Sequence, residues 1–193
     1  MRLSLYEHPD GYPPAGYRPA GVETAAGNRV VYDIAAGEAW FGAATVAGPA
    51  LRWELEAGGV GSEEPADAAL SVVLAPVAAP LIVRCDRIDF PPGGVAYRHT
   101  HPGPGIRRLL FGTIRIATDG HVTDYGPGGT WYESGSSPVH ATASATEDSA
   151  FVRVMVLPAE WEGKRTISYV DPADAEKPKL QRAHVYFEKV IAR

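Results

Sequence analysis

The sequence predicts an all-β protein, built as a sandwich or a small barrel. From Leu70 onward, short runs rich in β-branched and aromatic residues alternate with turn sequences such as "PPGG", "PGPG", "ATDG" and "GPGG". Short strands at spacings of about 8–12 residues, separated by Gly and Pro, are typical of sandwiches and barrels. Few segments keep a helical period over more than two turns, so we expect few and short helices.

Composition limits the class of protein. A chain of 193 residues has the length of one domain with a sizeable core. Its net charge of −5 argues against a nucleic-acid partner, which normally meets a basic face. No apolar run approaches the roughly 18 residues that span a bilayer, so we expect no membrane partner. The single cysteine, Cys85, cannot form an internal disulfide, and the first residues lack a signal-peptide core, which together favour a cytoplasmic location.

The N-terminal part differs in composition from the rest. Residues 1–28 are rich in Gly and Pro and predict an extended arm, in which Tyr6, Tyr12 and Tyr17 would dock onto the same subunit or a partner. Residues 29–193 predict a single domain. Its first segments, "RVVYDI" and "LRWELEA", predict two strands ahead of the main set.

The main set of strands follows in order, with one more strand near the C-terminus. We expect strands within residues 70–77, 80–90, 95–101, 106–116, 121–126, 130–134, 139–144, 151–158 and 183–191. In the strand at 151–158, three valines share one face while Arg153 and Met155 lie on the other. This alternation predicts a half-buried strand.

A pair of histidines is the strongest functional signal. His99 and His101 are two residues apart in a strand-like segment, so their imidazoles should project from the same face, as a chelating pair requires. A metal ion needs a further ligand from another strand. His140 is the candidate, because the 39 residues after His101 fit two or three strands that return the chain to the pair. Imidazole suits several metals, so ligand type alone does not select one.

The spacing around the pair resembles a known motif. The pattern Gly93-x5-His99-x-His101-x3-Gly105-x6-Gly112 resembles the first motif of the cupin superfamily. In that family a glutamate stands where this chain has Gly105.

A second motif of the same family is matched in spacing. The pattern Gly129-x5-Gly135-x-Ser137-x2-His140-x3-Ser144 keeps its first glycine and its histidine. The family's proline, second glycine and asparagine are replaced.

The resemblance covers roughly residues 75–157 and implies a fold and a metal. The fold would be a cupin-type double-stranded β-helix, a jelly-roll barrel, here with extra N-terminal strands. Family members bind one divalent metal with histidines that point into the barrel, which implies His99, His101 and His140 as ligands. Iron is the metal we expect for catalysis, with Zn, Ni and Mn as alternatives.

The missing glutamate allows two interpretations of the metal site. Three imidazoles would leave open positions for water, dioxygen or substrate, as a catalytic metal needs. Alternatively, the site has decayed and binds metal weakly or not at all. Glu133, in "TWYES", could supply a carboxylate as a fourth ligand or general base, or could be an exposed strand-end residue.

Three further residues are candidates for the pocket. Tyr97 shares strand parity with the histidine pair, and Trp131 shares parity with Glu133, so both would line a substrate pocket or pack in the core. Arg107 has the parity of Gly105 and would attract an anionic substrate, unless a bulge exchanges it with Arg108.

The resemblance leads to a functional hypothesis. We expect a metal-dependent cupin enzyme that acts on a small organic molecule, with dioxygenase-type oxidoreductase chemistry ahead of isomerase, decarboxylase or hydrolase chemistry. The alternatives are a non-catalytic sensor or storage module and an adapter-like dimer without metal. An open cavity would favour the enzyme and a filled one the binding role. A homodimer is expected, since many cupins pair through their sheets.

Overall fold

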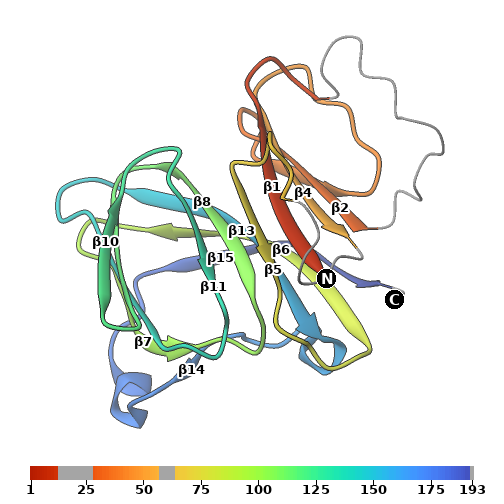
Figure 1. Cartoon of the computed structure of the whole chain (residues 1–193). Helices are drawn as coiled ribbons and strands as arrows, with labels where there is room; N and C mark the ends of the chain where they lie inside the picture. Colours follow the sequence, from red (N-terminus) through yellow and green to blue (C-terminus); the bar gives the residue numbers. More distant parts are fainter. Residues whose placement is uncertain (13–27, 57–63, 192–193) are drawn as a thin grey trace.

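The computed structural model describes residues 1–12, 28–56 and 64–191. These residues form three five-stranded antiparallel sheets and two short 3-10 helices (Figure 1). None of the helices in the described ranges is long and apolar enough to cross a membrane. The expected all-β class is confirmed.

The first sheet comes from the N-terminal part, in the order β3-β2-β4-β1-β5. Its strands are β1 (Arg2–His8), β2 (Arg29–Asp33), β3 (Glu38–Phe41), β4 (Ala50–Glu56) and β5 (Leu70–Val73).

Strand β1 forms the first part of the expected N-terminal arm. Residues 2–8 lie between β4 and β5 and pair with both. Leu3 and Leu5 are 1% and 0% exposed, and Tyr6 is buried under the guanidinium of Arg52, whose Cζ lies 3.8 Å from the ring centroid. The segment is a strand because its side chains find partners on both faces of the sheet. Tyr12 is also buried within the chain, whereas Tyr17 lies outside the described residues.

The other two sheets form a barrel. The second sheet has the order β11-β8-β13-β6-β15, and the third has the order β10-β9-β12-β7-β14. The second contains β6 (Leu81–Phe90), β8 (Gly105–Phe111), β11 (Thr130–Glu133), β13 (Ser149–Pro158) and β15 (Arg182–Ile191). The third contains β7 (Val95–Thr100), β9 (Ile114–Thr118), β10 (His121–Tyr125), β12 (Val139–Ala143) and β14 (Ser168–Tyr169).

The second sheet is the middle layer of three (Figure 1). One core cluster joins Leu5 and Trp53 of the N-terminal sheet to Val152 and Val154 of β13. A second cluster, which includes Phe151, lies on the barrel side, between the second and third sheets. Strand β13 is therefore buried on both faces, and not on one face as its alternation predicted.

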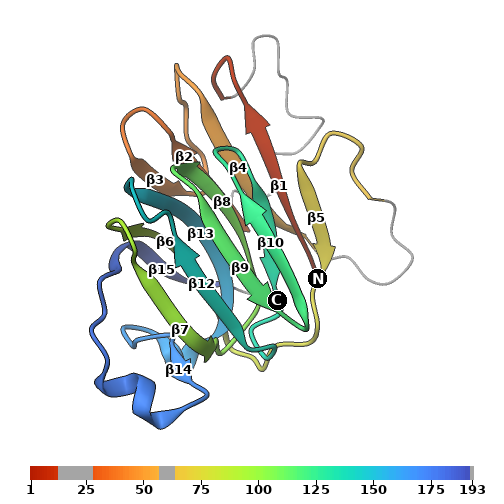
Figure 2. The ribbon, with the colours of Figure 1, turned by 90° about the vertical axis from the view of Figure 1, so that its left-hand side faces the viewer.

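The chain between β13 and β15 covers one end of the barrel. It contains η2 (Ala159–Trp161), β14 and η3 (Pro172–Glu176). Strand β14 pairs with β7, which attaches this segment to the edge of the third sheet (Figure 2). We call residues 159–181 the C-terminal cover.

Candidate functional site

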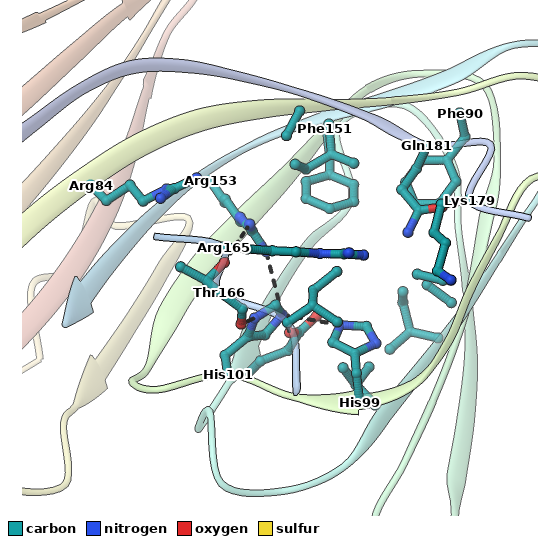
Figure 3. A pocket seen from close by; sticks show the side chains of 18 residues that line it. Arg84, Phe90, His99, His101, Phe151, Arg153, Arg165, Thr166, Lys179 and Gln181 are labelled. Atoms are coloured by element: carbon teal, nitrogen blue, oxygen red, sulfur yellow. Dashed lines mark hydrogen bonds and ion pairs between the residues drawn. The ribbon is translucent and has the colours of Figure 1, made fainter. Parts of the chain in front are cut away.

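A cavity of about 380 Å³ lies inside the barrel and opens beside the C-terminal cover (Figure 3). Its apolar walls come from both barrel sheets. They are formed by Ile88, Phe90, Ile116, Val139, Ala141 and Phe151. Its polar lining includes the histidine pair and Glu133. The volume is at the lower end of the range of small-molecule sites.

The histidine pair lies on one wall of this cavity. The Nε2 atoms of His99 and His101 are 3.2 Å apart. The Nδ1 atom of His99 is 2.6 Å from the carbonyl oxygen of Tyr97, and that of His101 is 2.7 Å from the carbonyl oxygen of Thr166. A carbonyl only accepts, so each Nδ1 carries the proton and each Nε2 presents a lone pair. The two lone pairs therefore converge.

Burial keeps both rings neutral. It lowers the pKa of His99, and it lowers the pKa of His101 further, with the charges of Arg153 and Arg107 acting in the same direction. The Nη1 atom of Arg153 is 3.3 Å from the His101 Nε2 atom. Neutral imidazoles with converging lone pairs are suited to bind a cation.

A buried ionic network holds Arg153 in place. Its Nε and Nη2 atoms are 2.6 and 3.1 Å from the carboxylate oxygens of Asp86, which is 0% exposed. Arg84 contacts the same carboxylate at 2.9 Å and reaches Glu188 at 2.8 Å. Burial raises the pKa of Asp86, but the charges and hydrogen bonds of the two guanidinium groups outweigh it, and the pKa is lowered overall. Arg153 is therefore neutralised without a ligand.

Glu133, on β11 of the other barrel sheet, reaches the histidine pair across the cavity. Its Oε1 atom accepts a hydrogen bond of 2.8 Å from the indole of Trp131. Its Oε2 atom lies 2.7 Å from Arg107 Nη2, in a poorly aligned ion pair, and 3.5 Å from His101 Nε2. Glu133 pairs directly with Gly105 across β11 and β8. The carboxylate thus stands opposite the position where the first motif has lost its glutamate.

These observations define the fold of the barrel. A jelly-roll barrel of two five-stranded sheets carries the first-motif histidines on its inner face, with a carboxylate opposite the altered motif position. The barrel has a cupin-type jelly-roll fold.

Comparison with known proteins finds partial similarities among solved structures. No protein-family model and no curated protein matches this sequence. A predicted oxalate decarboxylase from Thermotoga maritima is similar to 38% of this chain over 64% of its own length, with 25% identity and a TM-score of 0.33. An RmlC-like cupin from Shewanella frigidimarina matches 46% of this chain over 86% of its own, with 13% identity and a TM-score of 0.37.

A third solved structure is the polyketide cyclase RemF from Streptomyces resistomycificus. It matches 46% of this chain over 61% of its own length, with 17% identity and a TM-score of 0.37. This chain therefore spans less than two thirds of the length of the Thermotoga and Streptomyces proteins. The fold assignment rests on the strand order and the histidine pair, and the similarities carry no inference about activity.

The structure separates His140 from the other two histidines. Val139 is the residue that pairs with His99 in β12, and its side chain lines the cavity. Its neighbour His140 faces the opposite way, where its ring centroid is 6.5 Å from that of Tyr97. Strand parity, not motif spacing, decides which side chain enters the barrel. The expected third ligand is thus on the outer face.

The side chain of Tyr97 also lies outside the cavity, because of a shift in strand register. The pairing of β7 with β12 shifts register between Val139 and Ala141, so that Ala96 and His99 both line the cavity although they are three residues apart. A bulge of this kind breaks the parity that would have placed Tyr97 beside the pair. Its ring instead lies under Lys177 of the C-terminal cover, 4.7 Å from Nζ.

Trp131 and Arg107 are inside the barrel but do not line the cavity. Trp131 is 4% exposed and packs between Tyr125 and Phe151, with ring centroids 5.0 and 5.2 Å away. Arg107 is 0% exposed, and burial lowers its pKa to about 10. Both contact Glu133, so they position this carboxylate and do not meet a substrate.

The donor atoms of the pair fit a divalent metal ion. Two ligands about 2.1 Å from one ion are about 3.0 to 3.4 Å apart for angles between a right angle and a tetrahedral one. The observed separation of 3.2 Å falls in this interval. The carbonyls on both Nδ1 atoms are the second-shell contacts that orient metal-bound histidines. Within the described ranges no group of three or more His, Cys, Asp and Glu residues could hold a metal. Among the described residues, the cavity therefore offers the two imidazoles as candidate ligands.

Sequence reasoning did not identify all the polar groups of the cavity. Arg153 could have been identified from the sequence, because an arginine inside an apolar strand is costly to bury unless it is paired. Asp86 could have been identified in the same way, because it is an acidic residue inside the apolar segment "LIVRCDRIDF". Thr166, Arg165 and Lys179 come from the C-terminal cover, outside the motif-bearing residues 75–157.

Proposed function

We propose that this cupin is a metal-dependent enzyme that acts on a small organic molecule, with a divalent ion held by His99 and His101. The observation that carries the proposal is the convergence of two carbonyl-oriented Nε2 atoms, 3.2 Å apart, on the wall of a cavity of about 380 Å³. An open cavity also favours an enzyme over a storage or sensor role.

The residues around the pair would have separate roles. When bound, a divalent ion supplies Lewis acidity and lowers the pKa of its water. The carbonyls of Tyr97 and Thr166 hold the imidazoles in the tautomer that presents Nε2. Glu133, with Oε2 3.5 Å from His101, is placed to accept or return a proton. The apolar walls would exclude bulk water from the reacting molecule.

The nature of the reaction stays a prediction. Oxygenation on iron was the first expectation from the sequence, and a two-histidine site leaves positions open for dioxygen and substrate. Isomerase, decarboxylase and hydrolase chemistry use the same open positions.

Metal content of purified variants tests the proposal. Wild-type protein should hold up to one equivalent of metal after incubation with Fe(II), Zn, Mn or Ni and desalting, measured by elemental analysis. His99→Ala and His101→Ala should each lose most of it, because a single imidazole remains. His140→Ala is the matched control and should keep the wild-type content.

Two outcomes would contradict the proposal. One is an unchanged metal content in His99→Ala, with circular dichroism like that of the wild type. The other is a loss of metal in His140→Ala that equals the loss in His99→Ala, which would restore the three-histidine site.

A further inference from the structure

The charges that line the cavity are unlike those of the whole chain. The chain has a formal charge of −5. The cavity lining nevertheless contains four cationic side chains, Arg84, Arg153, Arg165 and Lys179, against one carboxylate, Glu133. A cavity enriched in one sign of charge attracts ligands of the opposite sign.

Two of the four cations are already neutralised. Arg84 and Arg153 share the carboxylate of Asp86, and Arg84 also contacts Glu188. Glu133 is paired in turn with Arg107. These charges form an internal network that needs no ligand.

Arg165 and Lys179 have no such partner. Within the described residues, neither has a carboxylate at ion-pair distance. The Nη2 atom of Arg165 donates a hydrogen bond of 2.8 Å to the hydroxyl of Tyr169. Both cations also meet the ring of Tyr169, at 5.5 Å from Arg165 Cζ and 5.3 Å from Lys179 Nζ. Each is held by neutral groups, and each still carries an uncompensated positive charge.

The local anchoring gives Arg165 a defined direction. Its two chain neighbours are fixed, because the carbonyl oxygen of Lys164 accepts a hydrogen bond of 3.0 Å from Arg84 and that of Thr166 accepts one of 2.7 Å from His101. Figure 3 shows the guanidinium of Arg165 extended across the cavity above His99, with Lys179 on the far side. Arg165 is exposed and Lys179 is half-buried, so both cations lie toward solvent, while the apolar side chains of the two barrel sheets line much of the interior.

We infer that the molecule bound here is a small organic carboxylate, with its apolar body between the barrel sheets and its carboxylate against Arg165 and Lys179. The inference rests on the proposed function and names its substrate class. A guanidinium beside an ammonium suits a carboxylate, because charge-assisted hydrogen bonds are about twice as strong as neutral ones. The aliphatic and aromatic walls suit an alkyl or aryl body.

The test compares ligands that differ only in charge. Hexanoate and benzoate are titrated into purified wild-type protein, with hexanamide and benzamide as neutral counterparts of the same shape, and binding is followed by NMR. The acids should bind about tenfold more tightly than the amides, as expected for a charged hydrogen bond.

Variants then locate the anion contact. Arg165→Gln and Lys179→Gln should each weaken hexanoate and benzoate binding by about five- to tenfold and leave the amides unchanged. Lys164→Gln removes the same charge from the adjacent position, where the side chain does not line the cavity, and should bind the acids as the wild type does.

Equal binding of acids and amides, or wild-type binding of the acids in both glutamine variants, would overturn the inference. Metal content is measured on the same preparations. If metal binding depends on His99 but acid binding does not depend on Arg165 or Lys179, the substrate class is wrong and the proposed function stands. If acid binding depends on Arg165 and Lys179 while His99→Ala keeps its metal, the proposed function is wrong and the substrate class stands.

Discussion

Arg153 shows how much one buried side chain decides in this site. Its guanidinium lies 3.3 Å from His101 Nε2, and Asp86 neutralises it from the other side. Without Asp86, a full positive charge would remain beside the two imidazoles in a low-dielectric environment. The Asp86 carboxylate is therefore the residue on which the electrostatics of the cavity depend.

Replacing Asp86 should be strongly destabilising. Asp86→Asn leaves Arg84 and Arg153 buried without their shared carboxylate, and breaking a buried ion pair in this way costs about 3–5 kcal/mol. Urea unfolding followed by circular dichroism measures the loss. The exposed pair of Arg115 and Asp124 supplies the control, and Asp124→Asn should unfold like the wild type. A wild-type midpoint for Asp86→Asn would show that the network contributes little.

At the scale of elements, the contact between β8 and β13 explains the altered motif. A Cβ atom at Gly105 would lie 2.5 Å from the carbonyl oxygen of Val154 and 2.8 Å from Met155 Cγ. The two strands approach too closely at this point for any side chain. The glycine is thus required by packing, and the carboxylate of this region comes from Glu133 on the neighbouring strand.

Placing the motif glutamate at position 105 should therefore destabilise the protein without improving metal binding. Gly105→Glu should lower the free energy of unfolding by about 1–3 kcal/mol or more, because it overpacks the core, and should not raise the metal content. Thermal unfolding and elemental analysis provide the two measurements. Gly126→Ala, at a position where an added Cβ meets no atom within 4 Å, is the control and should change neither. A stable variant with tighter metal binding would refute this account.

At the scale of the whole molecule, the N-terminal sheet is part of the same core as the barrel. Leu5 of β1 and Val154 of β13 belong to one cluster of buried residues. The sheet also covers the outer face of the layer that carries Arg153 on its inner face. Assembly as a homodimer stays a prediction.

A shared core predicts cooperative unfolding. Leu5→Ala should cost about 2–5 kcal/mol and shift the transition of the entire chain, measured by tryptophan fluorescence and circular dichroism in urea. Val122, which is 63% exposed on β10, offers the comparison, and Val122→Ala should change stability by less than about 0.5 kcal/mol. Separate transitions for the two probes, with only one of them shifted, would mean that the sheet and the barrel fold independently.

The sequence by itself determined the class of fold, most of the strands and the histidine pair. Each depends on local information, because strand alternation and Gly/Pro turns are encoded within a few neighbouring residues. His99 and His101 lie two residues apart and both follow the bulge, so their side chains still face the same side.

Only the tertiary structure decided which other residues join the pair. The bulge in β7 turned Tyr97 outward, and the register of β12 placed Val139 inside in place of His140. Register is set by pairing between distant strands, and one extra residue reverses every side chain beyond it. Arg165 and Lys179 reached the cavity through the fold of the C-terminal cover, which no local pattern encodes. The histidine pair was therefore predictable from the sequence, whereas the cationic opening required the folded chain.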